Sequence, residues 1–103
     1  MDNLEKQLSK VQELLFDLPE VKLYFSLREQ IEANETLQTM LKEIRHHQKA
    51  MTAAMENIQL YQTEKQIYQT LMDSYHSHPL IVNYEQVKEN VYLLLKQMQQ
   101  IIE

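Results

Sequence analysis

The chain has 103 residues, with 15 acidic and 10 basic side chains and a formal net charge of −5. It contains no glycine and no cysteine. The absence of glycine excludes a P-loop and a dinucleotide-binding fingerprint. The absence of cysteine excludes disulfides, thiolate zinc sites and iron–sulfur ligation by this chain. The length fits a single domain, residues 1–103, and the charge lacks the basic excess typical of dedicated nucleic-acid-binding proteins.

Helix-forming residues dominate the composition, and the tight turns of β-hairpins usually need glycine. We therefore expect an all-α protein, an antiparallel helical hairpin or bundle of four to five helices that forms oligomers. The longest apolar run is too short to span a bilayer, so we expect a cytoplasmic protein without direct membrane insertion. The predicted helices span about residues 3–18, 20–33, 35–57, 64–77 and 80–102.

The first predicted helix carries one apolar stripe with alternating spacings of four and three residues. Pro19 ends this helix and opens the next one, because proline fits the first helical turn but not a helix interior. The second helix is expected to break at Ala33-Asn34, where Asn34 tolerates a left-handed conformation and can also cap the third helix. The apolar face of the second helix consists of Val21, Tyr24, Phe25, Leu27 and Ile31.

The third predicted helix has the most regular pattern, an apolar seam at spacings of four and three with one polar position, Gln48. The phase changes after Ile58, and Thr63 with Gln66 fits a capping box. We therefore expect a turn within residues 57–63 and a fourth helix over 64–77, although one continuous helix is the alternative. The seam consists of Leu37, Leu41, Ile44, Gln48, Met51, Met55 and Ile58.

Pro79 is predicted to open the last helix, whose apolar face is wider than one stripe. The segment that starts at Pro79 repeats the pattern of the segment that starts at Pro19, with an offset of sixty residues. A shared amphipathic composition explains this repeat more simply than equivalent docking positions in a pseudo-symmetric bundle. The repeated positions pair Val21 with Ile81, Tyr24 with Tyr84, Leu27 with Val87 and Ile31 with Val91.

Catalytic and metal-binding patterns are weak. Glu43 with His46 and Asp73 with His76 have the spacing seen in di-iron helical bundles, but Glu43 and His46 point away from the predicted seam. No serine has a base and an orienting acid at a readable spacing. The sequence therefore predicts no catalytic residues, no metal, no cofactor and no enzymatic activity, and a di-metal enzyme is only a distant alternative.

A short basic stripe lies on the predicted third helix and consists of Lys42, Arg45, His46 and Lys49. It can contact RNA phosphates or an acidic partner. A charged stripe on an amphipathic helix is more often simply the solvated face, and no aromatic residues are interleaved with this one for base stacking. An RNA-binding helical module is therefore the alternative function.

The order of these elements resembles the YlbF/YmcA family of small bacterial helical proteins, related to YheA-like proteins. The resemblance lies in PEVKLYFSLREQIEANETLQTMLKEIRHHQKAM, which includes Gln48-Lys49, and in the last helix, HPLIVNYEQVKENVYLLLKQMQQIIE. It implies a regulatory adaptor in a complex with a YaaT-like protein. That complex is tied to competence, biofilm formation, sporulation and RNA processing by the membrane-anchored RNase Y. The cluster binding associated with that complex requires cysteines, which this chain lacks.

The leading hypothesis is thus a non-catalytic adaptor that acts through protein–protein contacts. The predicted partners are further copies of the chain, in a dimer or tetramer, and by resemblance other YlbF/YmcA-type proteins, a YaaT-like protein and RNase Y. The residues predicted for the core or the oligomer interface are Leu41, Ile44, Gln48, Met51, Met55, Ile58, Tyr84, Val91, Leu94, Leu95, Met98, Ile101 and Ile102.

Overall fold

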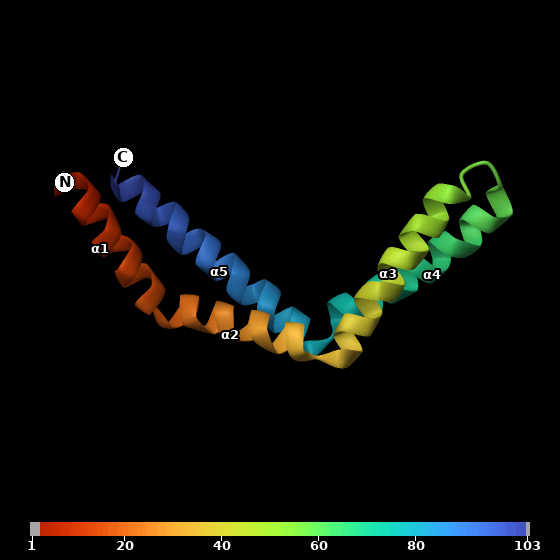
Figure 1. The fold of residues 1–103 in the computed structure, drawn as a ribbon, viewed down its shortest axis with the longest axis horizontal. Helices are drawn as coiled ribbons and strands as arrows, with labels where there is room; N and C mark the ends of the chain where they lie inside the picture. The colour runs from red at the N-terminus through yellow and green to blue at the C-terminus, as the bar shows by residue number, and fades with distance from the viewer. Residues whose placement is uncertain (1–2, 103) are drawn as a thin grey trace. The chain divides into compact units, whose positions relative to one another are not determined.

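The computed structural model describes residues 3–102 of the chain. This part is all-α and contains no strand, which confirms the predicted fold class. Figure 1 shows the elements in chain order: α1 (Asn3–Asp17), α2 (Pro19–Ala33), α3 (Glu35–Ala53), α4 (Ile58–Ser77) and α5 (Pro79–Ile102).

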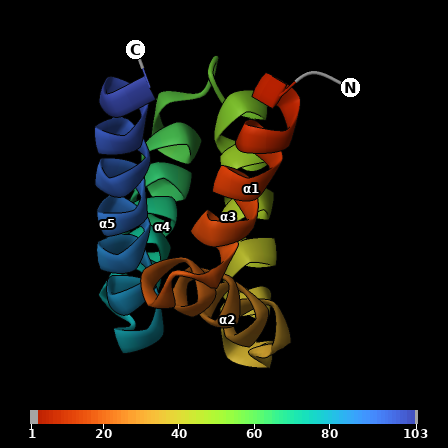
Figure 2. The ribbon, with the colours of Figure 1, turned by 90° about the vertical axis from the view of Figure 1, so that its left-hand side faces the viewer.

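The chain divides into two compact units, and the divisions fall inside α2 and α5. The terminal unit comprises residues 1–29 and 83–103, and the central unit comprises residues 30–82. In the terminal unit, Val21, Leu27 and Val87 are buried and form the core. Figure 2 views this unit with α1 and α5 along its two sides and α2 at its lower end.

Both prolines open helices as predicted. The Leu18 N–H donates to the Leu15 carbonyl, and the Leu18 carbonyl accepts from the Lys22 N–H at 3.0 Å, so α2 starts directly after Leu18. His78 makes the equivalent pair of bonds, with Tyr75 and Val82, and has extended backbone (φ −62°, ψ 131°). The residue before each proline thus leaves the helical conformation, because the proline ring clashes with a helical predecessor.

Asn34 separates α2 from α3 and caps α3 as predicted. Its Oδ1 accepts from the Leu37 N–H at 3.0 Å. Asn34 does not use the left-handed conformation that asparagine tolerates: it has φ −84° and ψ 108°, and no residue in the described range 3–102 has a positive φ. An N-cap residue adopts extended backbone of this kind while its side chain satisfies a free N–H of the first turn.

The turn between α3 and α4 lies at residues 54–57, which corrects the predicted third-helix end at 57 and fourth-helix start at 64. Asn57 is the cap: its Oδ1 accepts from the Leu60 N–H at 3.2 Å. The Thr63 hydroxyl donates to the Gln59 carbonyl inside α4, so the expected capping box does not form. One continuous helix is also wrong. Asn57 caps α4 six residues before Thr63, the cap expected from the sequence.

The central unit is built on an antiparallel hairpin of α3 and α4, which lie side by side (Figure 1). Leu37 and Ile44 are buried in it, as the seam predicts, but Gln48, Met55 and Ile58 are exposed. A strict seven-residue repeat drifts by about 20° per heptad around a straight α-helix. The contact face therefore shifts along α3.

The shift of the contact face brings one polar pair into the hairpin. His47 and Glu64 are half-buried, and their side chains form a short contact between the His47 Nδ1 and the Glu64 Oε2. Ala54 is buried near the turn. Sequence analysis missed His47 and Glu64. The available signal was the position of His47 three residues after the buried Ile44, on the same helix face.

Candidate functional site

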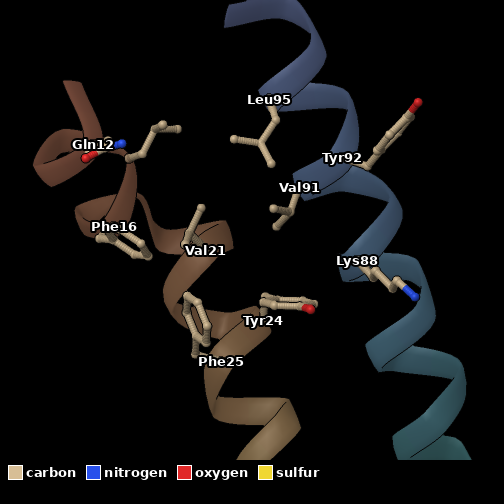
Figure 3. Close-up of a pocket in the computed structure, with 10 residues that line it drawn as sticks. Gln12, Phe16, Val21, Tyr24, Phe25, Lys88, Val91, Tyr92 and Leu95 are labelled. Carbon is tan, nitrogen blue, oxygen red and sulfur yellow. The ribbon is translucent and has the colours of Figure 1, made fainter. Parts of the chain in front are cut away.

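The terminal unit contains an apolar groove with a volume of about 660 Å³. It lies between α1 and α2 on one side and α5 on the other, as Figure 3 shows. We call this surface the terminal groove. Its lining consists of Gln12, Leu15, Phe16, Val21, Tyr24, Phe25, Lys88, Val91, Tyr92 and Leu95.

Aromatic rings form the α1–α2 side of the terminal groove. Phe16 and Phe25 lie 5.9 Å apart between ring centroids, and the ring of Tyr24 meets the ring of Phe25 edge-on at 5.3 Å. Phe16 and Phe25 remain 58% and 41% exposed, although aromatic side chains are normally a large part of a protein core. The α1–α2 junction at Pro19 makes this cluster possible, because it places the end of one helix beside the start of the next.

Tyr24 also connects α2 to α5. Its ring stacks on the ring of Tyr84 with centroids 5.5 Å apart and an interplanar angle of 22°. The Arg28 guanidinium lies 5.9 Å from the centroid of the Tyr24 ring, within cation–π range. The two rings come from equivalent positions of the sixty-residue repeat, so this repeat has a structural counterpart in the terminal unit.

The electrostatic surroundings of Tyr24 favour its ionised form. The Tyr84 hydroxyl donates a long hydrogen bond, 3.5 Å, to the Tyr24 oxygen. This bond lowers the pKa of Tyr24 below its ordinary value of 10.0, partial burial opposes that shift, and the positive charge of Arg28 adds to it.

The charge at the terminal groove differs in sign from the charge of the whole chain. The chain carries a net charge of −5, yet the lining contains one ammonium group, that of Lys88, and no carboxylate. Lys88 takes part in no ion pair within residues 3–102, where the ion pairs join Lys22 to Asp17 and His47 to Glu64. The groove is thus an apolar surface with a cation available at its edge.

The predicted interface residues of α5 divide between two environments. Val91 and Leu95 line the terminal groove, and Leu94 and Met98 are half-buried. Ile101 is 84% exposed, and the side chain of Ile102 lies outside the described part. In α3, Leu41 and Met51 are half-buried.

The four residues of the basic stripe, Lys42, Arg45, His46 and Lys49, are all exposed on α3. No ion pair involves them within the described range. The ring of His46 lies edge-on to the ring of His47 at 5.2 Å. The stripe is therefore accessible to an anionic ligand.

Sequence analysis identified most groove residues singly, as parts of helix stripes, but not as one surface. Phe16 was missed, and its signal was its position beside Leu15, outside the regular stripe of α1. Glu43, His46, Asp73 and His76 are exposed, and no group of three potential metal-ligating side chains occurs within residues 3–102. None of the described helices combines the length and apolar character needed to cross a membrane.

Comparison with known proteins supplies the functional context. The family described as "Control of competence regulator ComK, YlbF/YmcA" matches residues 4–103. The chain belongs to the YlbF/YmcA family. This is a regulatory family, in agreement with the resemblance found in the sequence. No curated protein and no solved structure matches the chain.

Proposed function

We propose that this YlbF/YmcA protein is a non-catalytic adaptor that controls competence by binding other proteins. The observation that carries the proposal is the terminal groove, an exposed apolar surface in a chain of a competence-control family. Apolar grooves between helices accept the apolar face of a binding partner. The adaptor works in a complex that modulates RNA processing by RNase Y, and through it biofilm formation and sporulation.

A YaaT-like protein and other YlbF/YmcA-type proteins are the proposed members of this complex. The chain itself assembles as a homo-oligomer through the end of α5, where Ile101 is highly exposed. Covering this side chain in a symmetric contact removes apolar surface from water. The assembly leaves the terminal groove for a different protein.

A genetic experiment tests the regulatory role. Deletion of the gene in the native bacterium should change the output of a ComK-dependent reporter, and the unmodified gene should restore it. Mapping of transcript ends in the same strains should show altered processing at RNase Y sites. An unchanged reporter in the deletion strain would contradict control of competence.

A biochemical experiment tests the adaptor mechanism. The purified chain should not cleave RNA alone, and a tagged copy expressed at its native level should co-purify with RNase Y and a YaaT-like protein. Cleavage of RNA by the purified chain, retained after further purification steps, would replace the adaptor with a nuclease.

A further inference from the structure

The lining of the terminal groove defines the chemistry of its occupant. The lining is apolar over most of its area, and its polar side chains are Gln12, the hydroxyls of Tyr24 and Tyr92, and the ammonium of Lys88. Lys88 is the one charged residue in this lining. An occupant must therefore present apolar groups along the groove and favours a negative charge beside Lys88.

The position of Lys88 determines which end of the occupant carries the negative charge. Along α5, Lys88 comes one turn before Val91 and two turns before Leu95, a distance of about 10 Å at 1.5 Å per residue. Figure 3 shows Lys88 towards one end of the groove residues on α5 and Leu95 towards the other, across from Gln12. A matching ligand therefore carries its negative charge about two helical turns from the far end of its apolar stripe.

We propose that the terminal groove binds an amphipathic helix of a partner protein, with an Asp or Glu of that helix paired with Lys88. This inference rests on the adaptor function proposed above and specifies the partner chemistry. Grooves between helices accept the apolar face of a third helix, read at i, i+3 or i+4 and i+7. The partner helix fills the space between the α1–α2 side and α5, and its carboxylate neutralises the Lys88 ammonium.

The aromatic side of the groove supplies the apolar contacts. Phe16 and Phe25 already pack against one another, so a docked helix covers preformed rings. Covering large, rigid rings costs little side-chain entropy, which is why aromatic anchors dominate many interfaces. The pairing with Lys88 contributes a smaller share, because a partly exposed ion pair is worth about 1 kcal/mol or less.

The direct test uses the full-length chain and two synthetic peptides. Each peptide has about fifteen residues, long enough for appreciable helicity, with Leu at i, i+3 or i+4 and i+7 on one face. One carries Glu at the position facing Lys88, and the other carries Lys there. Fluorescence anisotropy should show tighter binding of the Glu peptide, by about two- to fivefold, and this preference should fall as salt is added.

Two pairs of variants provide matched controls on α5. Leu95 and Leu93 are equally exposed, at 47% and 48%, but only Leu95 belongs to the groove lining. Leu95→Asp should weaken binding of the Glu peptide about tenfold or more, and Leu93→Asp should leave it nearly unchanged. Lys88→Glu should reverse the peptide preference, and Lys96→Glu, outside the lining, should not.

Several outcomes would overturn this assignment. Equal losses from Leu95→Asp and Leu93→Asp would show that the peptides bind elsewhere, and an unchanged preference in Lys88→Glu would remove the charge pairing. If Leu95→Asp alone converted an oligomer to a monomer, a second copy would be the occupant. Circular dichroism confirms that each variant is folded before its binding is interpreted.

The reporter strains separate this inference from the proposed function. If Leu95→Asp complements the deletion as well as the unmodified gene, the groove proposal fails while the regulatory role stands. If deletion leaves the reporter unchanged, the regulatory role fails whatever the peptides bind. If both variants are folded, loss of complementation by Leu95→Asp but not by Leu93→Asp supports both the groove proposal and the regulatory role.

Discussion

Tyr24 and Tyr84 occupy equivalent positions of two similar segments, and their rings stack at 5.5 Å in the terminal unit. Sequence analysis explained the similarity by amphipathic composition. The same periodicity buries the flanking positions in both segments: Val21 and Leu27 in one, Ile81 and Val87 in the other. Composition accounts for these buried positions, whereas the stacking requires that the two segments meet.

The first prediction concerns the ionisation of Tyr24. Replacement of Tyr84 by Phe removes the hydrogen-bond donor and should raise the pKa of Tyr24 towards its ordinary value. Carbon NMR of labelled tyrosine measures the titration, and Tyr92→Phe is the control that leaves the Tyr24–Tyr84 bond intact. An unshifted Tyr24 titration in Tyr84→Phe would show that the long bond does not persist in solution.

The sign of the stability effect follows from the lowered pKa. Because the folded pKa of Tyr24 lies below the unfolded one, the associated stabilisation is complete above the unfolded pKa. It is lost as the pH falls through the folded value. Its contribution to the unfolding free energy is therefore smaller at neutral pH than at alkaline pH. Chemical denaturation should show that the stability advantage of the unmodified chain over Tyr84→Phe is larger at alkaline pH than at neutral pH.

At the scale of the helices, α3 and α4 both begin at an asparagine N-cap. Asn34 and Asn57 precede α3 and α4, and each side chain accepts an N–H bond from the first helical turn. Ala54, the C-cap of α3, also has a negative φ, −97°. Both helix starts therefore need an acceptor side chain and not a left-handed residue.

The second prediction compares these caps. Asn34→Ala should lower the unfolding free energy by about 1 kcal/mol, because its bond reaches the fully buried Leu37. Asn57→Ala should cost less, since its bond is longer and exposed. Urea denaturation measures both, and Asn34→Asp, which keeps the acceptor, should retain most of the stability. A loss in Asn34→Asp as large as in Asn34→Ala would contradict the capping explanation.

The third prediction concerns the basic stripe on α3. Simultaneous replacement of Lys42, Arg45 and Lys49 by Gln should change the unfolding free energy by about 0.5 kcal/mol or less, because these side chains are exposed and unpaired. If RNA binds this face, anisotropy with a labelled single-stranded oligonucleotide should show weaker binding and a shallower salt dependence. Identical RNA binding by the triple variant would leave the stripe as a solvated helix face.

At the scale of the whole molecule, the fourth prediction concerns self-association through the end of α5. Ile101→Glu should lower the mass measured by light scattering at micromolar concentration. It replaces an apolar side chain that is 84% exposed with a charged one, in the middle of the proposed contact between copies. Because Ile101 is so exposed, this substitution should not unfold the chain, so a lower mass would indicate dissociation. Gln100→Glu adds the same charge at the neighbouring exposed position and is the matched control.

A monomer mass for the unmodified chain at that concentration would contradict homo-oligomer formation. Leu94→Glu gives a second comparison, because Leu94 is half-buried. This substitution should either dissociate the oligomer or reduce the helical signal in circular dichroism. Glu13→Ala, on the exposed face of α1, should do neither.

Local chemistry was enough to predict much of this protein. The all-α class and the helix starts at Pro19 and Pro79 depend on residues close together in the chain, so the sequence predicts them directly. Asn34 also acts within one helical turn. These features need no knowledge of which helices pack together.

The site depended on contacts between distant segments. The α3–α4 seam follows 3.6 residues per turn, so it brings His47 against Glu64 and leaves Gln48 exposed, unlike the strict heptad pattern. Lys88 and Phe16 meet at one groove only because α5 lies across from the α1–α2 junction. Periodicity identifies the apolar face of each helix, but only the tertiary structure decides which other helix packs against that face.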